Sequence, residues 1–167
     1  MSQTEPWLPV EWEHPTRLDL NTGQHLRPIR EDDLAIDYPA VMGSRERLWS
    51  IYGRAWGWPP EAMTWEADRA DLAYHEEEIA QHRSFNYALV NEDETELLGC
   101  VYIDPPERVD ADAEISWWVV DALVGTPVEA DLDQMVPAWI ERDWPLRHPR
   151  YVGRDLSWQE WLALPQV

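Results

Sequence analysis

Apolar and polar residues alternate along several short stretches of the chain, as they do in half-buried strands. Leu18 and Leu20 alternate with polar neighbours, and the turn signal Asn21-Thr22-Gly23 follows them directly. Because alternation on both sides of a turn is typical of a hairpin, the first two strands are expected to pair. Strands are predicted over residues 17–20, 24–29, 85–90, 97–103, 113–120 and 150–156.

Between these strands, apolar residues recur with the helical period. The clearest apolar stripe is Leu132, Met135, Val136, Trp139 and Ile140. Helices are predicted from about residue 31, over 44–52, from 64 to about 83, from 126 through 140 and over 157–164. Pro39 and Pro137 interrupt two of these patterns, so the first helix is expected to bend or end early and the fourth to kink.

One domain accommodates all of these elements. The length of 167 residues is enough for a single core, and no internal repeat is present. Residues 1–16 are rich in Pro, Trp and Glu without a helical or strand period, so they are expected to form an irregular arm. Residues 17–167 are expected to form one domain of the α/β (α+β) class.

The charge of the chain excludes some classes of partner. It carries 33 acidic and 13 basic residues, a net charge of −20, and every basic residue is an arginine. Such a surface repels phosphate backbones and anionic lipids and attracts a small cationic amine, although a genomic bias or solubility alone would also explain it. No apolar run is long enough for a membrane span, so a cytoplasmic location is expected. The single cysteine, Cys100, lies in an apolar run and is interpreted as a core residue.

Three segments in this order resemble the GNAT acetyltransferases. They are the opening segment Leu26-Arg27-Pro28-Ile29-Arg30-Glu31-Asp32-Asp33, the central hairpin over 85–103, and the strand Glu114-Ile115-Ser116-Trp117-Trp118-Val119. The resemblance covers residues 24–158. It implies a mostly antiparallel central sheet flanked by helices, and transfer of acetyl from acetyl-CoA to a primary amine without a covalent intermediate.

The resemblance also implies which residues would hold the cofactor. Val119 and Val120 would offer backbone groups to the pantetheine arm, and Gly125 and Thr126 would donate to the pyrophosphate. This loop departs from the family pattern, however, because Pro127 has no N–H to donate and Glu129 occupies a small-residue position. The start of the helix is therefore expected to cap itself with Thr126 and Glu129 and to disfavour a pyrophosphate.

Catalytic candidates follow from the same resemblance. Glu114 lies on the strand where the family often places a general base, with a solvated strand residue as the alternative interpretation. The family tyrosine that serves as general acid is missing from 157–161, and Tyr151 is the nearest substitute. The family usually continues with two further strands, whereas this chain closes at Val167, so a sheet shortened at the C-terminus is expected.

Two clusters are candidates for the acceptor site. Trp49, Tyr52, Trp56 and Trp58 lie where the family places its acceptor-specificity helices, and aromatic faces suit an ammonium group. A second cluster follows one stripe of a predicted helix: Asp71, His75, Glu78 and His82. This stripe suits a divalent metal or a cationic ligand, but a solvent-facing charged stripe is the alternative, and no metal site is assigned.

Two functions remain open from the sequence. The first is an N-acetyltransferase for a primary amine. The alternative is a non-catalytic module that binds a small molecule or a protein and has lost CoA binding. The alternative predicts a filled or narrowed gap between the strands at 113–120 and 150–156, and a homodimer through a sheet edge or the tryptophan-rich surface is also possible.

Overall fold

The central feature of the computed structural model, which describes residues 5–167, is a single six-stranded sheet. Its strands are β1 (Leu18–Asp19), β2 (His25–Pro28), β3 (Phe85–Val90), β4 (Leu97–Asp104), β5 (Ala113–Val119) and β6 (Pro149–Tyr151). They lie side by side in chain order. All neighbours are antiparallel except β5 and β6, which run parallel. The mostly antiparallel sheet expected from the resemblance is confirmed.

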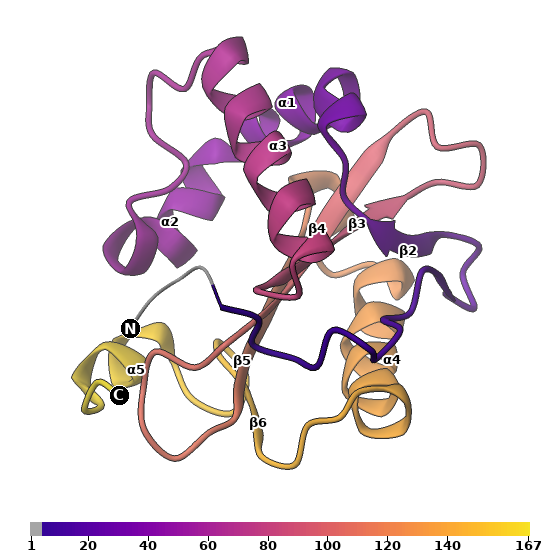
Figure 1. Ribbon diagram of the computed structural model, residues 1–167. Coiled ribbons are helices and arrows are strands. Elements are labelled where there is room, and N and C mark those ends of the chain that lie inside the picture. The colour runs from indigo at the N-terminus through magenta and orange to yellow at the C-terminus, as the bar shows by residue number, and fades with distance from the viewer. Residues whose placement is uncertain (1–4) are drawn as a thin grey trace.

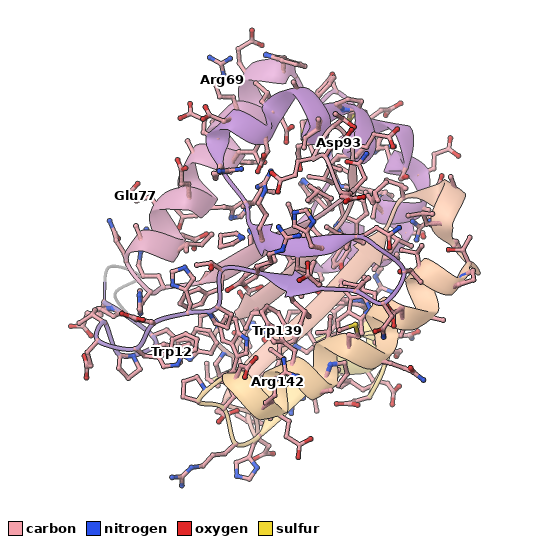
Figure 2. The ribbon with its side chains drawn as sticks, turned by 90° about the vertical axis from the view of Figure 1, so that its right-hand side faces the viewer. Trp12, Arg69, Glu77, Asp93, Trp139 and Arg142 are labelled. Carbon is pink, nitrogen blue, oxygen red and sulfur yellow. The ribbon has the colours of Figure 1, made fainter. Side chains whose placement is uncertain are left out.

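The helices lie on both faces of the sheet. They are α1 (Leu34–Gly43), α2 (Arg45–Trp56), α3 (Trp65–Ala80), α4 (Pro127–Asp143) and α5 (Trp158–Ala163), with short 3-10 turns η1 (Glu31–Asp33) and η2 (Asp121–Leu123). Figure 1 shows the path of the chain through these helices and the strands of the sheet. In the side view of Figure 2, α1 and α3 lie above the sheet and α4 below it.

The core lies between the sheet and these two helical layers. Every residue of β3 and β5 is buried, because helices cover both faces of these inner strands. On the α4 side, Trp139 lies between the helix and the sheet (Figure 2), and its ring centroid is 5.0 Å from that of Tyr87. The apolar stripe predicted for α4 is thus the one that the fold buries.

The strand pattern predicted the sheet to within a few residues, and both helices that contain an internal proline continue past it. Helix α1 continues through Pro39 to Gly43, and α4 continues through Pro137 to Asp143. In α4 the neighbouring Val136 and Trp139 are at most 1% exposed. Tertiary packing of this buried stripe therefore outweighs the hydrogen bond that proline removes.

Other boundaries shifted as well. Helix α2 runs to Trp56, four residues further than predicted, and ends at Gly57 in the left-handed conformation. The last strand ends at Tyr151, and only an isolated bridge joins Val152 to Leu156. Trp65, the first residue of α3, is 41% exposed.

The N-terminal segment packs onto the domain without regular structure. Residues 5–17 contain no helix or strand, and residues 1–4 of the predicted arm lie outside the described residues. The Trp7 N–H donates to the carbonyl of His82 at 2.8 Å, and the rings of Trp12 and Trp144 are 4.9 Å apart. The tryptophans therefore anchor this segment, as the sequence suggested.

Among the described helices, not one combines the length and the apolar character that a bilayer crossing requires.

Candidate functional site

Two adjoining cavities open on the side of the sheet that carries α2 and α3. The larger has a volume of about 850 Å³ and lies among α5, the β4–β5 loop and the ends of α2 and α3. The smaller, called here the acidic cavity, has a volume of about 400 Å³ and lies between α1, α3 and the strands β3 and β4. Both are lined in part by Trp56, Glu78 and Asp104, so they meet there.

Glu114 lines the larger cavity, but neighbouring groups engage its carboxylate. One oxygen accepts from the Glu107 N–H at 2.7 Å. The other accepts from Trp161 Nε1–H at 2.5 Å and lies 3.4 Å from Arg150 Nη1. Glu114 is 8% exposed, and both of its carboxylate oxygens accept hydrogen bonds. Its side chain therefore connects α5, β6 and the β4–β5 loop to β5.

Tyr151 lies on the other face of the sheet from Glu114. Side chains alternate along a strand, and Tyr151 aligns with Ile115, the residue after Glu114. Its ring contacts Trp117 at 6.0 Å between centroids. Burial, together with the nearby Asp155, raises the pKa of Tyr151 to about 12. The structure therefore does not bring these two catalytic candidates together.

Three of the four predicted aromatic residues gather beside the cavities. The rings of Tyr52 and Trp56 stack at 4.5 Å, and Trp58 meets Tyr52 edge-on at 5.8 Å. Trp56 lines both cavities and Trp58 the acidic one. Tyr52 is fully buried, its hydroxyl lies 3.3 Å from Ser116 Oγ, and burial raises its pKa.

Trp49 is placed elsewhere. Its side chain is 42% exposed, and the guanidinium of Arg45 lies 5.3 Å from the ring centroid. Trp49 lines neither cavity. On this helix, the sequence signal identified the aromatic residues but could not identify which of them face inward.

In the charged stripe predicted on α3, too, some residues line a cavity and one lies elsewhere. Asp71, His75 and Glu78 line the acidic cavity, where His75 Nδ1 lies 3.1 Å from Glu78 Oε1. His82 lies past the end of α3 with φ of 55°, and its Nδ1 is 2.9 Å from the carbonyl of Pro9. Within the described part of the chain, no three His, Cys, Asp or Glu residues are arranged to hold a metal ion.

Four polar residues of the acidic cavity were not identified from the sequence. They are Asp37 on α1, Asp68 on α3, Asn86 on β3 and Asp104 at the end of β4. Asp37, Asp68 and Asn86 are each 3–4% exposed. The available signal was a polar residue inside an apolar pattern, as with Asp37 between Leu34 and Val41. Only the packing of α1 on α3 shows that these residues share one cavity.

The pKa values of these carboxyl groups reflect their burial. Burial, and next the charge of Asp68, raises the pKa of Asp37 well above its usual range. Burial also raises the pKa of Asp68 and Asp71. It raises the pKa of Asp104 to about 7, although Ser84 donates a hydrogen bond to this carboxylate. Buried carboxyl groups without a neutralising cation favour the protonated form.

The loop that precedes α4 uses its own donors internally. Gly125, with φ of 77°, turns the chain, and its N–H donates to Glu129 Oε1 at 3.0 Å. The Thr126 N–H and hydroxyl both donate to the carbonyl of Leu123, at 3.1 and 2.6 Å. The expected capping by Thr126 and Glu129 is not formed: the Thr126 side chain does not cap the helix, and Glu129 accepts from Gly125, the residue before the N-cap.

The backbone groups of Val119 and Val120 are engaged as well. The Val120 N–H donates to the carbonyl of Leu98 at 2.9 Å, which continues the β4–β5 ladder. The Val119 carbonyl accepts a hydrogen bond from the guanidinium of Arg47. Arg47 also pairs with Asp121 at 2.6 Å. All four predicted cofactor contacts therefore have partners within the protein.

An arginine spans the region where β5 and β6 stop pairing. The last paired residues are Ile115 and Tyr151. Arg154, just beyond β6, lies 3.9 Å above the centroid of Trp117 on β5. It also pairs at 3.0 Å with Asp133 on α4, which accepts from Trp117 Nε1–H at 2.8 Å. These contacts connect β5, α4 and the segment after β6.

No protein-family model matches the sequence, and no curated protein does either. Several solved structures match the fold. The ribosomal-protein-S5-alanine acetyltransferase from Vibrio fischeri superposes with a TM-score of 0.58 at 15% identity, over 75% of this chain and 67% of that one. RimL, a ribosomal L7/L12 α-N-protein acetyltransferase in complex with coenzyme A, gives 0.59 at 16% identity, over 75% and 68%.

A third match extends further along this chain. Mycobacterium smegmatis RimJ, in complex with CoA-disulfide, superposes with a TM-score of 0.54 at 19% identity, over 86% of this chain and 68% of that one. This chain thus spans about two thirds of each of these three proteins. At such identities the likeness establishes the fold, which is that of the GNAT acetyltransferases.

Proposed function

We propose that this chain is a small-molecule binding protein built on the GNAT acetyltransferase fold, and that it does not use acetyl-CoA. The observation that carries the proposal is the hydrogen bond from the Gly125 N–H to Glu129 Oε1 at 3.0 Å. It places a carboxylate at the start of α4, where a pyrophosphate would need backbone donors and the positive end of the helix dipole.

The charge around this helix start supports the proposal. Glu129, Asp131 and Asp133 all lie in the first two turns of α4. The nearby arginines, Arg47 and Arg154, each pair with an aspartate. Two unit negative charges about 4 Å apart repel by about 4 kcal/mol near a protein surface. A pyrophosphate would therefore meet the negative charges of Glu129 and Asp131, which have no ion-pair partner among the described residues, whereas Asp133 is paired with Arg154.

The path of the pantetheine arm gives a second argument. Arg47 occupies the carbonyl of Val119, and Arg154 stacks on Trp117 between β5 and α4. A pantetheine arm that used the Val119 carbonyl or packed on Trp117 would have to displace these arginines. The residues present thus do not fit the cofactor in this arrangement.

The chemistry of transfer gives a third argument. A general base must reach the proton that it removes, but both oxygens of Glu114 already accept hydrogen bonds inside the protein. Tyr151 lies on the opposite face of the sheet. The two candidates therefore cannot act as the base and acid of one reaction centre.

The competing function is acetyl transfer from acetyl-CoA to a primary amine. It is favoured by the CoA complexes of RimL and RimJ. The start of α4 also favours it. The first hydrogen bond of this helix runs from the Ala130 N–H to the Thr126 carbonyl, so the N–H groups of Val128 and Glu129 have no partner within the helix and could donate to a phosphate. Both functions predict ligand binding, but only acetyl transfer predicts thiol release.

Thiol release from acetyl-CoA separates the two functions. The purified chain would be incubated with millimolar acetyl-CoA and a panel of primary amines, and free CoA thiol would be measured with a colorimetric reagent. We expect release no faster than in a matched sample without protein. Amine-dependent release that scales with protein concentration would establish the transferase instead.

A further inference from the structure

The acidic cavity collects carboxyl groups, most of which have no ion-pair partner among the described residues. Five of its lining residues are acidic: Asp37, Asp68, Asp71, Glu78 and Asp104. No arginine is among the described residues that line it, and the chain contains no lysine. Of these five carboxylates, Glu78 is the one that pairs with a histidine, His75. This lining favours a positively charged ligand over a negatively charged one.

Two buried acceptors point to a missing donor. Among the described residues, Asn86 Oδ1 has no hydrogen-bond partner and Asp68 Oδ2 has none apart from the neighbouring Asp37 carboxyl group; Asp68 and Asn86 are each 3% exposed and line the cavity. A buried polar atom without a partner is costly in free energy, so folded proteins seldom retain one without a role. An ammonium group brings three N–H donors and a positive charge, which both atoms can accept.

Aromatic faces complete the cavity. Trp56, Trp58 and Tyr102 line it, and the ring centroids of Trp56 and Tyr102 are 5.3 Å apart. Aromatic rings attract cations through the negative potential of their faces, most strongly where water is excluded. The same rings contact the methylene groups of an aliphatic chain. The cavity thus suits charged groups joined by an apolar linker.

The acidic residues are spread along the helix rather than focused on one point. Asp68 and Glu78 are ten residues apart on α3, which corresponds to about 15 Å along the helix axis. At the Glu78 end, the acidic cavity meets the larger one. A ligand with several charges in a row matches this distribution better than a compact ion does. The absence of a metal-type cluster among the described residues agrees with this.

We propose that the acidic cavity binds a linear aliphatic polyamine, with one ammonium group at Asp68 and Asn86 and another near Glu78 and Asp104. This assignment rests on the proposed function, because it names the ligand of the binding protein. The polyamine is bound and not altered, so no bond forms or breaks.

The protonation of the cavity is compatible with such a ligand. Burial, and next the charge of Asp68, raises the pKa of Asp37 well above its usual range. Burial also raises the pKa of Asp104 to about 7. An ammonium group that contacts these carboxyl groups would favour their ionised forms. Polyamine binding should therefore release protons near neutral pH.

The test is calorimetric titration of the full chain with spermidine at low salt. Three variants accompany it: Asp68→Asn, which removes the buried charge; Asp71→Asn, at the more exposed part of the cavity; and Glu77→Gln as control. Glu77 projects from the outer side of α3 (Figure 2) and bonds to Gln81 at 2.9 Å, a bond that glutamine can keep. All three substitutions remove one negative charge from the same helix.

The proposal predicts one spermidine per chain, an affinity about tenfold or more weaker for Asp68→Asn, and no change for Glu77→Gln. Asp68→Asn should melt at the same or a higher temperature than the unchanged chain, because it removes an unpaired buried charge. This combination, weaker binding without lower stability, distinguishes a site from a folding defect. If Asp68→Asn does not fold, the same loss of binding is expected for Asp71→Asn.

Three outcomes would overturn the proposal. They are the absence of saturable heat at millimolar spermidine, equal losses for Asp68→Asn and Glu77→Gln, and equally tight binding of n-butylamine, which carries one ammonium group. A titration with CoA distinguishes rejection of the polyamine site from rejection of the proposed function. Saturable CoA binding alongside spermidine binding would reject the proposed function and leave the polyamine site standing.

Discussion

Asp104 is the single residue whose environment gives the clearest pH dependence. Its carboxylate accepts a hydrogen bond from Ser84, but burial raises its pKa to about 7. Glu78 and Glu107 raise this pKa further, whereas His75 lowers it. In the unfolded chain the pKa is close to 3.8. The folded state therefore binds a proton more tightly than the unfolded state between these two values.

The consequence for stability follows from linkage. A raised pKa in the folded state contributes stability that is fully present below about pH 3.8 and is lost as the pH rises through about 7. Asp104→Asn removes this contribution. The variant should therefore gain free energy of unfolding relative to the unchanged chain as the pH rises from 5 to 8, by about 2–4 kcal/mol.

Urea denaturation at several pH values measures this difference directly. Glu92→Gln, in the exposed β3–β4 loop, is the charge-matched control and should follow the unchanged chain at every pH. Parallel curves for Asp104→Asn and the unchanged chain would mean that Asp104 is ionised in the folded protein throughout this range.

Single residues also show where reasoning from the sequence ends. The sequence identified Trp56, Trp58, Asp71, His75 and Glu78 because each lies in a recognisable aromatic or charged pattern. It could not identify Asp37 or Asp68, because a polar residue in an apolar stripe becomes informative only once the facing helix is known. For the same reason Trp49 could not be separated from its neighbours on α2.

At the scale of elements, α5 depends on one buried carboxylate. Trp161 Nε1–H donates to Glu114 at 2.5 Å, and the guanidinium of Arg108 lies 4.3 Å from the centroid of the Trp161 ring. Arg150 lies 3.4 Å from the same carboxylate oxygen. These contacts hold a helix of only six residues, which is too short to be stable by itself.

Glu114→Gln should therefore destabilise the fold. Both carboxylate oxygens accept from donors, so the amide nitrogen of glutamine would face another donor in either orientation. Breaking one side of a buried ion pair costs about 3–5 kcal/mol. Urea denaturation would measure the loss, with Glu107→Gln as the control because the Glu107 side chain is exposed. Equal stability of the two variants would contradict this structural role for Glu114.

Most elements could be predicted because their patterns are local. The strands β3, β4 and β5 could be predicted from apolar runs bounded by turn residues. The start of α3 could be predicted because Thr64 is a typical N-cap residue, and its side chain accepts from the Ala67 N–H at 3.1 Å. Helices α1 and α4 continue past Pro39 and Pro137, and the tertiary packing that stabilises them there is not a local signal. The end of the last strand was predicted wrongly. The N–H groups of Arg154 and Asp155 donate to the carbonyl of Tyr151, so the chain turns there instead of continuing the strand pairing.

For the whole molecule, the net charge of −20 should make stability depend on salt. Like charges repel most in the compact state, and salt screens this repulsion. The melting temperature should rise between 10 mM and 500 mM sodium chloride, by about 2–4 °C for each kcal/mol of repulsion removed. A differential scanning calorimetry series measures this. A melting temperature that falls with salt would indicate that the ion pairs of the protein outweigh its net charge.

For the whole molecule, the GNAT fold is combined with a loop before α4 whose Gly125 and Thr126 donors bond within the protein. The fold could be predicted from the order of its strands and helices, which the pattern of apolar and polar residues indicates. Closure of the loop was anticipated from Pro127 and Glu129, whereas the contributions of Arg47 and Arg154 come from contacts across the sheet. Neither arginine has a sequence neighbour that would have indicated its partner.

The most direct measurement is calorimetric titration of coenzyme A into the unchanged chain and into Glu129→Gln at low salt. We expect no saturable heat for the unchanged chain up to millimolar CoA, and at most weak binding for Glu129→Gln, which removes the charge at the start of α4. Saturable one-to-one binding of CoA to the unchanged chain at micromolar concentrations would contradict it.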